Sequence, residues 1–131
     1  MAKQKKIVVI GGSAAGPKAA SRARRMDPKA AITMIQKGPD FSMASCGYPY
    51  FVGGTFDERS KLLSTPTGVV RDANFFAKAK DIKALSLTEV TSINRQEKTI
   101  SCSSTANGET FSFPYDKLVI ATGATPIVPP I

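Results

Sequence analysis

A glycine-rich turn between a short apolar run and a helix-forming segment constrains the fold of this chain more than any other feature. The run Lys6–Ile10 (KIVVI) is rich in β-branched residues, which is typical of a buried strand. The turn GGSAAG occupies 11–16, and Pro17 follows it at a position that the first turn of a helix tolerates. Strong helix formers over 18–26 predict a helix, and Ala31–Ile35 predicts a second buried strand. These segments predict a βαβ unit with parallel strands.

The turn itself predicts binding of a diphosphate, because the N–H groups and the dipole at a helix N-terminus attract anions. The dinucleotide fingerprint G-x-G-x-x-G places glycines at its first and third fixed positions but a serine at the middle one. The alternative is a tight turn without a ligand, and the strand–turn–helix context favours a dinucleotide. We therefore assign six residues of the turn to cofactor binding: Gly11, Gly12, Ser13, Ala14, Ala15 and Gly16.

The end of the second predicted strand is where a dinucleotide site usually places an acid that binds the ribose, about 20 residues after the turn. Here Gln36 occupies that place and Lys37 follows it. An amide can donate or accept a hydrogen bond to ribose, but it lacks the charge-assisted bond of a carboxylate. An exposed polar strand end explains Gln36 equally well, and both residues are candidates for cofactor binding.

The remainder of the chain predicts loops, one more helix and a second sheet. Loop residues dominate 38–54, and the pattern over 67–80 predicts a helix that starts near Thr65 and Pro66. Alternating segments separated by turn residues predict an antiparallel β-meander within 84–113, with strands at 84–93, 98–103 and 110–113. A buried parallel strand follows at 117–121, and the proline-rich 125–131 predicts a linker. The predicted fold class is α/β, and 131 residues suffice for one domain.

Composition excludes several classes of protein. No apolar run approaches the roughly 20 residues of a membrane helix, and no export signal is evident, so we expect a cytoplasmic protein without membrane contact. The chain has two cysteines and no histidine, which argues against a disulfide scaffold, His-based triads and most zinc sites, and no metal site is expected. The net charge of +8 suits a polyanionic partner, either nucleic acid or a phosphate-rich small molecule, but solubility alone also explains it. Nucleic acid is disfavoured because the basic residues lack interleaved aromatics and a groove-reading motif.

Three segments together resemble one family: IVVIGGSAAG, SMASCGYPYFVGG and YDKLVIATGATP. They resemble the flavin-dependent pyridine nucleotide-disulfide oxidoreductases, and within them the single-cysteine coenzyme A-disulfide reductase branch, which includes NADH-dependent persulfide and polysulfide reductases. The resemblance implies a Rossmann-like FAD-binding domain and NAD(P)H as co-substrate. It also implies that 1–131 is the N-terminal part of that domain, that 125–131 leads to an NAD(P)H domain, and that the complete protein is a homodimer.

The same resemblance implies that Cys46 is the redox-active thiol beside the flavin. Phe41 stands where other family members carry a second cysteine, so Cys46 would pair with the sulfur of a small molecule. A cysteine at a helix start beside cations is favoured as a thiolate nucleophile, whereas a single cysteine without such a flank is more often an inert buried thiol. Cys102 has no such flank, and we expect it to be structural or incidental.

The resemblance also implies substrate and flavin contacts. Lys18, Arg22 and Arg25 share one face of the predicted helix, which is either a solvated face or a surface for coenzyme A. Ser45 replaces the asparagine of many members, and Ala14 replaces a histidine of the related peroxidases, which argues against peroxide reduction. The implied substrate-binding residues are Lys18, Arg22, Arg25, Ser42 and Ser45, and the further cofactor-binding residues are Val90, Ala121, Thr122 and Gly123.

Two classes of function follow. The first is the N-terminal portion of a flavin-dependent NAD(P)H oxidoreductase that reduces coenzyme A disulfide, persulfide or polysulfide through Cys46, or an NADH oxidase of the same family. Coenzyme A is then a possible ligand. The second is a non-catalytic nucleotide-binding module.

Overall fold

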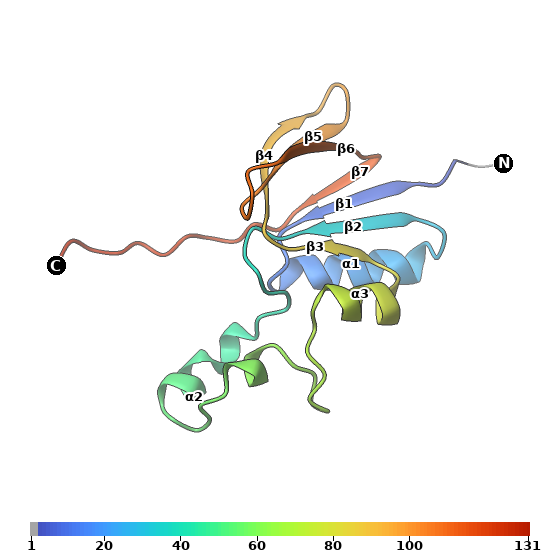
Figure 1. Cartoon of the computed structure of the whole chain (residues 1–131). Helices are drawn as coiled ribbons and strands as arrows, with labels where there is room; N and C mark the ends of the chain where they lie inside the picture. The colour runs from blue at the N-terminus through green and yellow to red at the C-terminus, as the bar shows by residue number, and fades with distance from the viewer. Residues whose placement is uncertain (1–2) are drawn as a thin grey trace.

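The computed structural model describes residues 3–131 and contains two sheets (Figure 1). The larger sheet is parallel, in the order β3-β2-β1-β7, with β1 at Lys6–Ile10, β2 at Ala31–Ile35, β3 at Lys83–Leu85 and β7 at Lys117–Ile120. The smaller sheet is an antiparallel meander of β4 (Thr88–Asn94), β5 (Thr99–Ser104) and β6 (Thr110–Pro114). The α-helices are α1 (Ala15–Met26), α2 (Tyr48–Val52) and α3 (Ala73–Lys80), and 3-10 helices cover Ser45–Gly47 and Arg59–Leu62.

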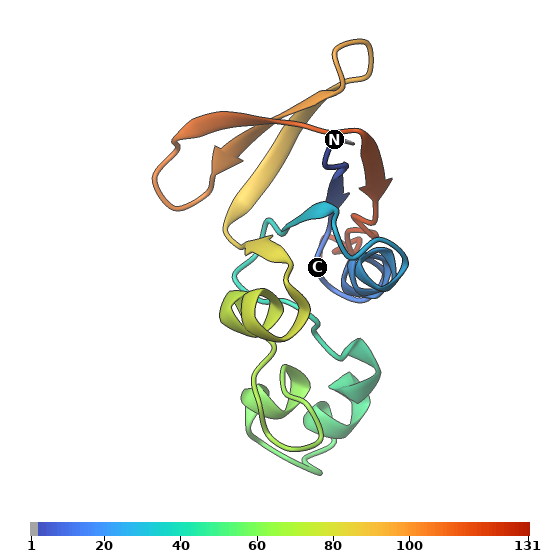
Figure 2. The ribbon, with the colours of Figure 1, turned by 90° about the vertical axis from the view of Figure 1, so that its right-hand side faces the viewer.

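The parallel sheet is the middle layer, with α1 and α3 on one face and the meander on the other (Figures 1 and 2). Alternate residues of β1 divide between the two cores. Ile7 and Val9 join the core on the helix side, together with Ala20 and Phe76. The second core lies on the meander side of the sheet and contains Val8, Ile10, Ile35, Ile100 and Cys102. Burial on both faces explains why β1 reads as a continuous apolar run and not as an alternating one.

The edge of the sheet beside β1 is closed by a strand from the far end of the chain. β7 pairs with β1 in parallel, and a pair of hydrogen bonds marks where the pairing starts. The Lys6 N–H donates to Asp116 Oδ2 at 2.7 Å, and the Asp116 N–H donates to the Lys6 carbonyl at 2.8 Å. The first of these bonds lowers the pKa of Asp116 below its ordinary value. β7 therefore enters the sheet at a defined register, which places Ala121 beside the turn that follows β1.

The helix predicted over 67–80 is shorter in the structure, because α3 begins at Ala73. Asp72 caps it, since its Oδ1 accepts from the Phe75 N–H at 2.8 Å. Thr65, where the helix was predicted to start, instead closes a tight loop. The chain turns back after Thr65, and the Thr65 hydroxyl accepts a hydrogen bond from the Val69 N–H at 3.1 Å. Gly68 adopts a φ of +85° in this loop, a conformation that a helix excludes. The prediction that the helix includes residues 67–72 was wrong, because this loop forms hydrogen bonds within itself.

The predicted strand over 84–93 is two strands in two different sheets. β3 pairs with β2 in parallel, whereas β4 begins the meander. Leu87 separates them with a φ of +51°, so the chain changes direction there. The meander therefore starts at Thr88 and extends to Pro114, while Ala84 belongs to the parallel sheet.

Residues 45–63 form a small lobe below the helix layer, which we call the cysteine lobe (Figures 1 and 2). Its core is small: Leu62 and Leu63 are buried, and the rings of Phe51 and Phe56 lie 5.8 Å apart. An ion pair between Arg59 and Asp40 ties the lobe to the loop that follows β2. Several apolar side chains of α2 remain exposed, among them Tyr50 and Val52.

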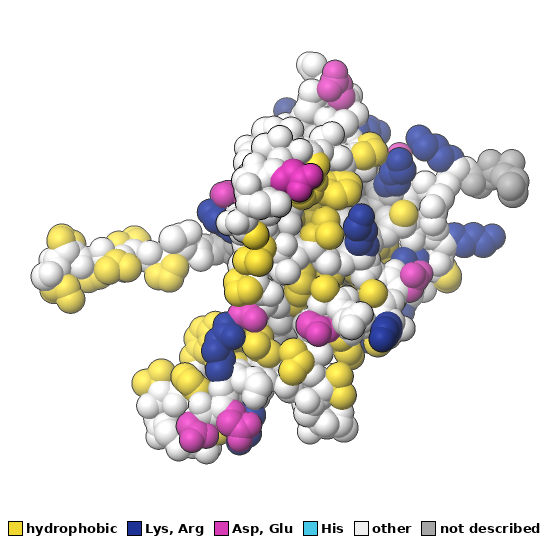
Figure 3. Space-filling view, viewed as in Figure 1, with side chains coloured by type: hydrophobic (Ala, Val, Ile, Leu, Met, Phe, Trp, Pro, Cys, Tyr) yellow, Lys and Arg dark blue, Asp and Glu magenta, His cyan; other side chains and the backbone are white. Residues whose placement is uncertain are grey.

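The C-terminal residues leave the body as an exposed extension, which Figures 1 and 3 show. Residues 122–131 are exposed and belong to no helix or strand. Across the part of the chain that the structure describes, no helix has the length and hydropathy needed to cross a bilayer.

Arg24 joins the ends of three elements beneath the helix layer. Its Nη1 donates to the carbonyls of Pro28 at 2.8 Å and Ala30 at 2.7 Å, and its Nη2 bonds both the carbonyl and the carboxylate of Asp81. Only 16% of the side chain is exposed. Arg24 thus connects the end of α1, the start of β2 and the end of α3.

We expect Arg24→Met to lower the free energy of unfolding by about 1–3 kcal/mol, because it leaves the bonded carbonyls of the α1–β2 loop without their donor. Urea unfolding followed by circular dichroism measures the change. Arg22→Met is the matched control, since Arg22 is exposed on the same helix, and it should shift the unfolding free energy by less than about 0.5 kcal/mol. Equal losses in both variants would contradict the structural role of Arg24.

Candidate functional site

The glycine turn after β1 is packed so closely that two of its positions accept no side chain. Gly11 has a φ of +106°, and a Cβ on it would lie 2.0 Å from the carbonyl oxygen of Ala121. A Cβ on Gly16 would lie 1.7 Å from the carbonyl oxygen of Gly11. Both distances are well inside van der Waals contact, so the turn requires glycine at the first and third fingerprint positions. Ser13 takes the middle position without a clash because it is exposed.

Some backbone N–H groups of the turn form hydrogen bonds within the protein, and others are free to bind a ligand. Gly11 donates to the Ile35 carbonyl at 2.8 Å, and Gly12 donates to Gln36 Oε1 at 2.8 Å. Within residues 3–131, the N–H groups of Ser13, Ala14 and Ala15 donate no hydrogen bond. These open donors lie at the N-terminus of α1, where the helix dipole also favours negative charge. The turn is therefore organised as a site for a phosphate group.

A groove of about 510 Å³ runs along these donors. Beyond the turn itself, Gln36 and Lys37 line it on one side and residues 121–124 line it on the other. A second groove of about 250 Å³ adjoins it, and Gly11, Gln36, Lys37 and Thr122 line both. The second groove continues to Glu89 and Val90 on β4, with Ile10, Ile35 and Thr88 at its base. The two adjoining grooves, with the open N–H groups in the first, offer room for the two halves of a dinucleotide such as FAD.

The segment that carries Cys46 is tied to the glycine turn. The Ser42 N–H donates to the Gly12 carbonyl at 2.7 Å, so the loop after β2 passes directly along the turn. Four residues later, Cys46 lies exposed in the 3-10 helix Ser45–Gly47, immediately before α2. The Gly47 N–H donates to the Ala44 carbonyl at 2.9 Å, and a Cβ on Gly47 would lie 2.6 Å from a methyl carbon of Leu62. The lobe thus holds the thiol on the outside of a tight turn.

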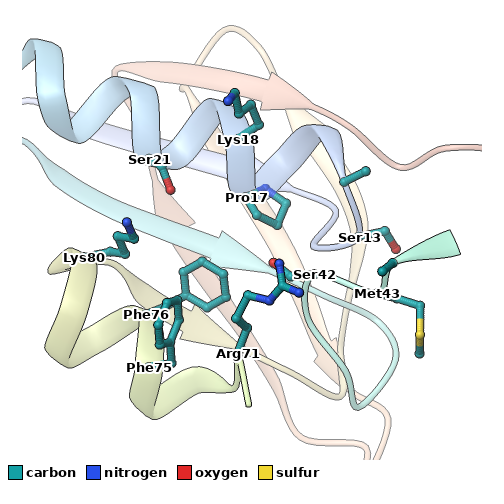
Figure 4. A pocket seen from close by; sticks show the side chains of 12 residues that line it. Ser13, Pro17, Lys18, Ser21, Ser42, Met43, Arg71, Phe75, Phe76 and Lys80 are labelled. Carbon is teal, nitrogen blue, oxygen red and sulfur yellow. The ribbon is translucent and has the colours of Figure 1, made fainter. Parts of the chain in front are cut away.

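A basic pocket of about 420 Å³ lies between α1, α3 and the loop after β2 (Figure 4). Three cationic side chains line it, Lys18, Arg71 and Lys80, and none of its lining residues is acidic. Hydroxyl and apolar groups complete the lining, contributed by Ser13, Ser21, Ser42, Pro17, Met43, Phe75 and Phe76, with Ala14 and Ala44. Figure 4 shows α3 supplying Phe75 and Lys80 on one side of the pocket, with Ser13 and Met43 opposite. The pocket therefore offers cationic side chains to a phosphate and apolar side chains to a flat apolar group.

The structure brings some of the predicted substrate residues together and leaves others apart. Lys18 and Ser42 line the basic pocket. Arg22, Arg25 and Ser45 are exposed and do not line it. Their predicted contact with substrate stays a prediction.

Two pocket residues, Arg71 and Lys80, were missed by sequence reasoning. Arg71 donates through its guanidinium to the Leu63 carbonyl at 3.4 Å and also to the Ser64 carbonyl, which joins the end of the cysteine lobe to the segment before α3. Arg71 precedes the N-cap of α3 and Lys80 is its last residue, and no local sequence signal indicated that the two line one pocket.

The predicted cofactor residues outside the turn lie around the two grooves. Val90 lines the second groove, and Ala121, Thr122 and Gly123 line the first. Cys102 is buried in the meander core, as expected, and burial raises the pKa of its thiol. Among residues 3–131, no group of three or more potential metal ligands lies close enough to hold an ion.

Comparison with known proteins places the chain in a family. The family model for pyridine nucleotide-disulphide oxidoreductases matches residues 5–131, nearly the whole chain. The chain belongs to this family. The resemblance indicated by the three sequence segments is therefore confirmed.

Several similar proteins are coenzyme A disulfide reductases or persulfide reductases. Coenzyme A disulfide reductase of Staphylococcus haemolyticus is 37% identical over 120 residues, which cover 92% of this chain and 26% of that protein. The structure of a NAD-dependent persulfide reductase from A. fulgidus is 48% identical, has a TM-score of 0.91, and aligns over 96% of this chain and 23% of that one. Reduced CoADR-RHD of Bacillus anthracis is 38% identical, with a TM-score of 0.87 over 99% of this chain and 22% of that one.

These alignments confirm the predicted α/β class of the family fold, since the parallel sheet, its helices and the meander are all present. The chain spans about a quarter of the length of the curated relative.

A charge placed in the glycine turn should separate nucleotide binding from folding. Ala14→Asp adds a carboxylate at the N-cap of α1, where it can accept from the first helical turn and favour the helix. The same carboxylate repels a diphosphate at the open N–H groups, so we expect affinity for ADP to fall at least about tenfold. Calorimetric titration and thermal unfolding measure the two effects. Ala106→Asp, in the exposed β5–β6 turn, is the control and should leave ADP affinity unchanged.

The two cysteines should differ strongly toward an alkylating reagent. Cys46 is exposed, whereas Cys102 is 1% exposed and its raised pKa keeps it in the unreactive thiol form at neutral pH. We expect iodoacetamide to modify Cys46 at least about tenfold faster, because Cys102 reacts only when the meander core opens. Peptide mass spectrometry over a time course measures both rates. Equal rates in the folded chain would contradict the burial of Cys102.

Proposed function

We propose that this chain is the N-terminal part of the FAD-binding domain of a flavin-dependent NAD(P)H oxidoreductase that reduces coenzyme A disulfide, a persulfide or a polysulfide. The observation that carries the proposal is the position of the single exposed thiol. Cys46 follows a segment hydrogen-bonded to the glycine turn, and that same segment lines the acid-free basic pocket through Ser42 and Met43. The names of two similar proteins, coenzyme A disulfide reductase and persulfide reductase, support this chemistry.

Each part of the site has a role that its chemistry suits. The open N–H groups of Ser13, Ala14 and Ala15 bind the diphosphate of FAD, and the groove bounded by Val90 holds its adenosine. Residues 121–123 line the opposite wall, where backbone groups reach the cofactor. When bound, FAD supplies the electron pair that originates from NAD(P)H.

Cys46 carries the substrate step. As a thiolate it attacks one sulfur of the disulfide, a new S–S bond to Cys46 forms, and the other half leaves as a thiolate. Two electrons and a proton then restore the Cys46 thiol and release the second half. Lys18, Arg71 and Lys80 provide positive charge for the phosphates of a coenzyme A substrate, and Phe75 offers an apolar surface beside them. Arg22, Arg25 and Ser45 extend this surface if the substrate reaches beyond the pocket.

The proposal extends to the complete protein. We expect a cytoplasmic homodimer in which further domains bind NAD(P)H and cover surfaces that are open here. The exposed apolar residues of α2, such as Tyr50 and Val52, are suited to such covering because isolated apolar groups in water gain by burial.

Thiol–disulfide exchange tests the proposal on the chain itself. Incubation with coenzyme A disulfide should add one coenzyme A to Cys46 and release one coenzyme A thiol, which intact-protein mass spectrometry detects. Cys46→Ser should abolish the adduct, while Cys102→Ser should retain it. Oxidised glutathione, which lacks phosphates, should react more slowly. Failure of Cys46 to form the adduct would favour the non-catalytic nucleotide-binding module.

The basic pocket has its own test in the same reaction. Lys80→Gln should slow adduct formation with coenzyme A disulfide about two- to fivefold, the effect expected of a partly exposed ion pair. Lys78→Gln is the control, because Lys78 lies on the same helix but does not line the pocket. Neither variant should alter the reaction with oxidised glutathione by a comparable factor.

A further inference from the structure

The neutral residue at the end of β2 uses its side-chain oxygen to bond the glycine turn. Gln36 Oε1 accepts from the Gly12 N–H at 2.8 Å, which fixes the turn against the strand end. The other amide atom, Nε2, is a donor only. Gln36 therefore lines the second groove, which we call the adenosine groove, without the carboxylate that a dinucleotide site normally presents to ribose.

A carboxylate does line this groove, but it comes from a different element. Glu89 lies in β4, and it is the one acidic residue among those that line the second groove. Its Oε1 lies 2.8 Å from Lys37 Nζ, and within residues 3–131 its Oε2 accepts no hydrogen bond. The Glu89 side chain is 42% exposed, so one oxygen is held while the other remains open to a ligand.

Lys37 explains how an acid can be tolerated so close to a diphosphate site. Lys37 lines both grooves, and its ammonium is paired with Glu89 at the groove that adjoins the open N–H groups of the turn. An unpaired carboxylate there would repel the diphosphate, whereas the paired one is neutralised locally. An exposed ion pair contributes little to folding, which leaves its position at the groove as its main consequence.

We propose that Glu89, held by Lys37, is the residue that accepts the ribose hydroxyl hydrogen bonds of the bound adenosine diphosphate moiety, in place of the acid missing at Gln36. This inference rests on the proposed function, because it requires that the glycine turn bind the diphosphate. It assigns the recognition of ribose to the meander and not to the parallel sheet.

ADP is the probe for a test, because the described residues contain both the turn and the adenosine groove. Calorimetric titration of the chain should show that ADP binds about tenfold more tightly than 2′,3′-dideoxy-ADP, the effect of a charge-assisted hydrogen bond. Glu89→Gln should remove most of this preference. Adding Gln36→Glu to that variant should restore it, because a second carboxylate oxygen then faces the groove. Glu109→Gln, on the exposed β5–β6 hairpin, is the control and should keep the full preference.

The outcomes separate the two hypotheses. If Glu89→Gln keeps the tenfold preference while its thermal unfolding matches the unsubstituted chain, the role of Glu89 is overturned and the diphosphate site stands. If the folded, unsubstituted chain binds neither nucleotide, the proposed function of the turn fails and the role of Glu89 fails with it. A lost preference that Gln36→Glu restores supports the inference against a general loss of structure.

Discussion

The contact between the glycine turn and the end of β7 is the constraint on which the site depends. The carbonyl of Gly11 lies where a side chain on residue 16 would stand, and the carbonyl of Ala121 lies where a side chain on residue 11 would stand. These approaches bring α1 down onto β1 and bring residues from both ends of the chain to the same groove. A segment over a hundred residues away in sequence therefore forms one wall of the groove at the glycine turn.

Local patterns were sufficient to predict the central layer. β1 and β2 have the predicted bounds, because strands buried on both faces are marked by continuous apolar runs. The predicted bounds were wrong where a tertiary contact or a capping residue determines where a helix or strand begins or ends. The Asp72 cap shortens α3, and a positive φ at Leu87 divides the predicted strand between two sheets. Neither event leaves a periodic signal, since each depends on one residue whose partner is set by the surrounding fold.

Candidate site residues could be named from the sequence where a motif carries them. The turn residues follow from their spacing, and Cys46 follows from the resemblance of its flanking residues to those of the family. Side chains that converge from separate elements were not predictable in this way. Arg71 and Lys80 line one pocket with Lys18 because α3 and the segment before it lie beside α1, and Lys37 pairs with Glu89 because β4 passes the end of β2. Their sequence separation hides the shared site.

The hydrogen bond from the Ser42 N–H to the Gly12 carbonyl couples the position of the segment that leads to Cys46 to that of the glycine turn. Any ordering of the turn restricts the segment as well, and any displacement of the segment pulls on a carbonyl of the turn. Thermodynamic linkage makes such coupling reciprocal. If a bound nucleotide raises the affinity of Cys46 for a ligand by stabilising residues 42–46, that ligand raises the affinity for the nucleotide by the same factor. If the proposed roles of the turn and of Cys46 hold, nucleotide binding and ligand binding at Cys46 are linked in this way.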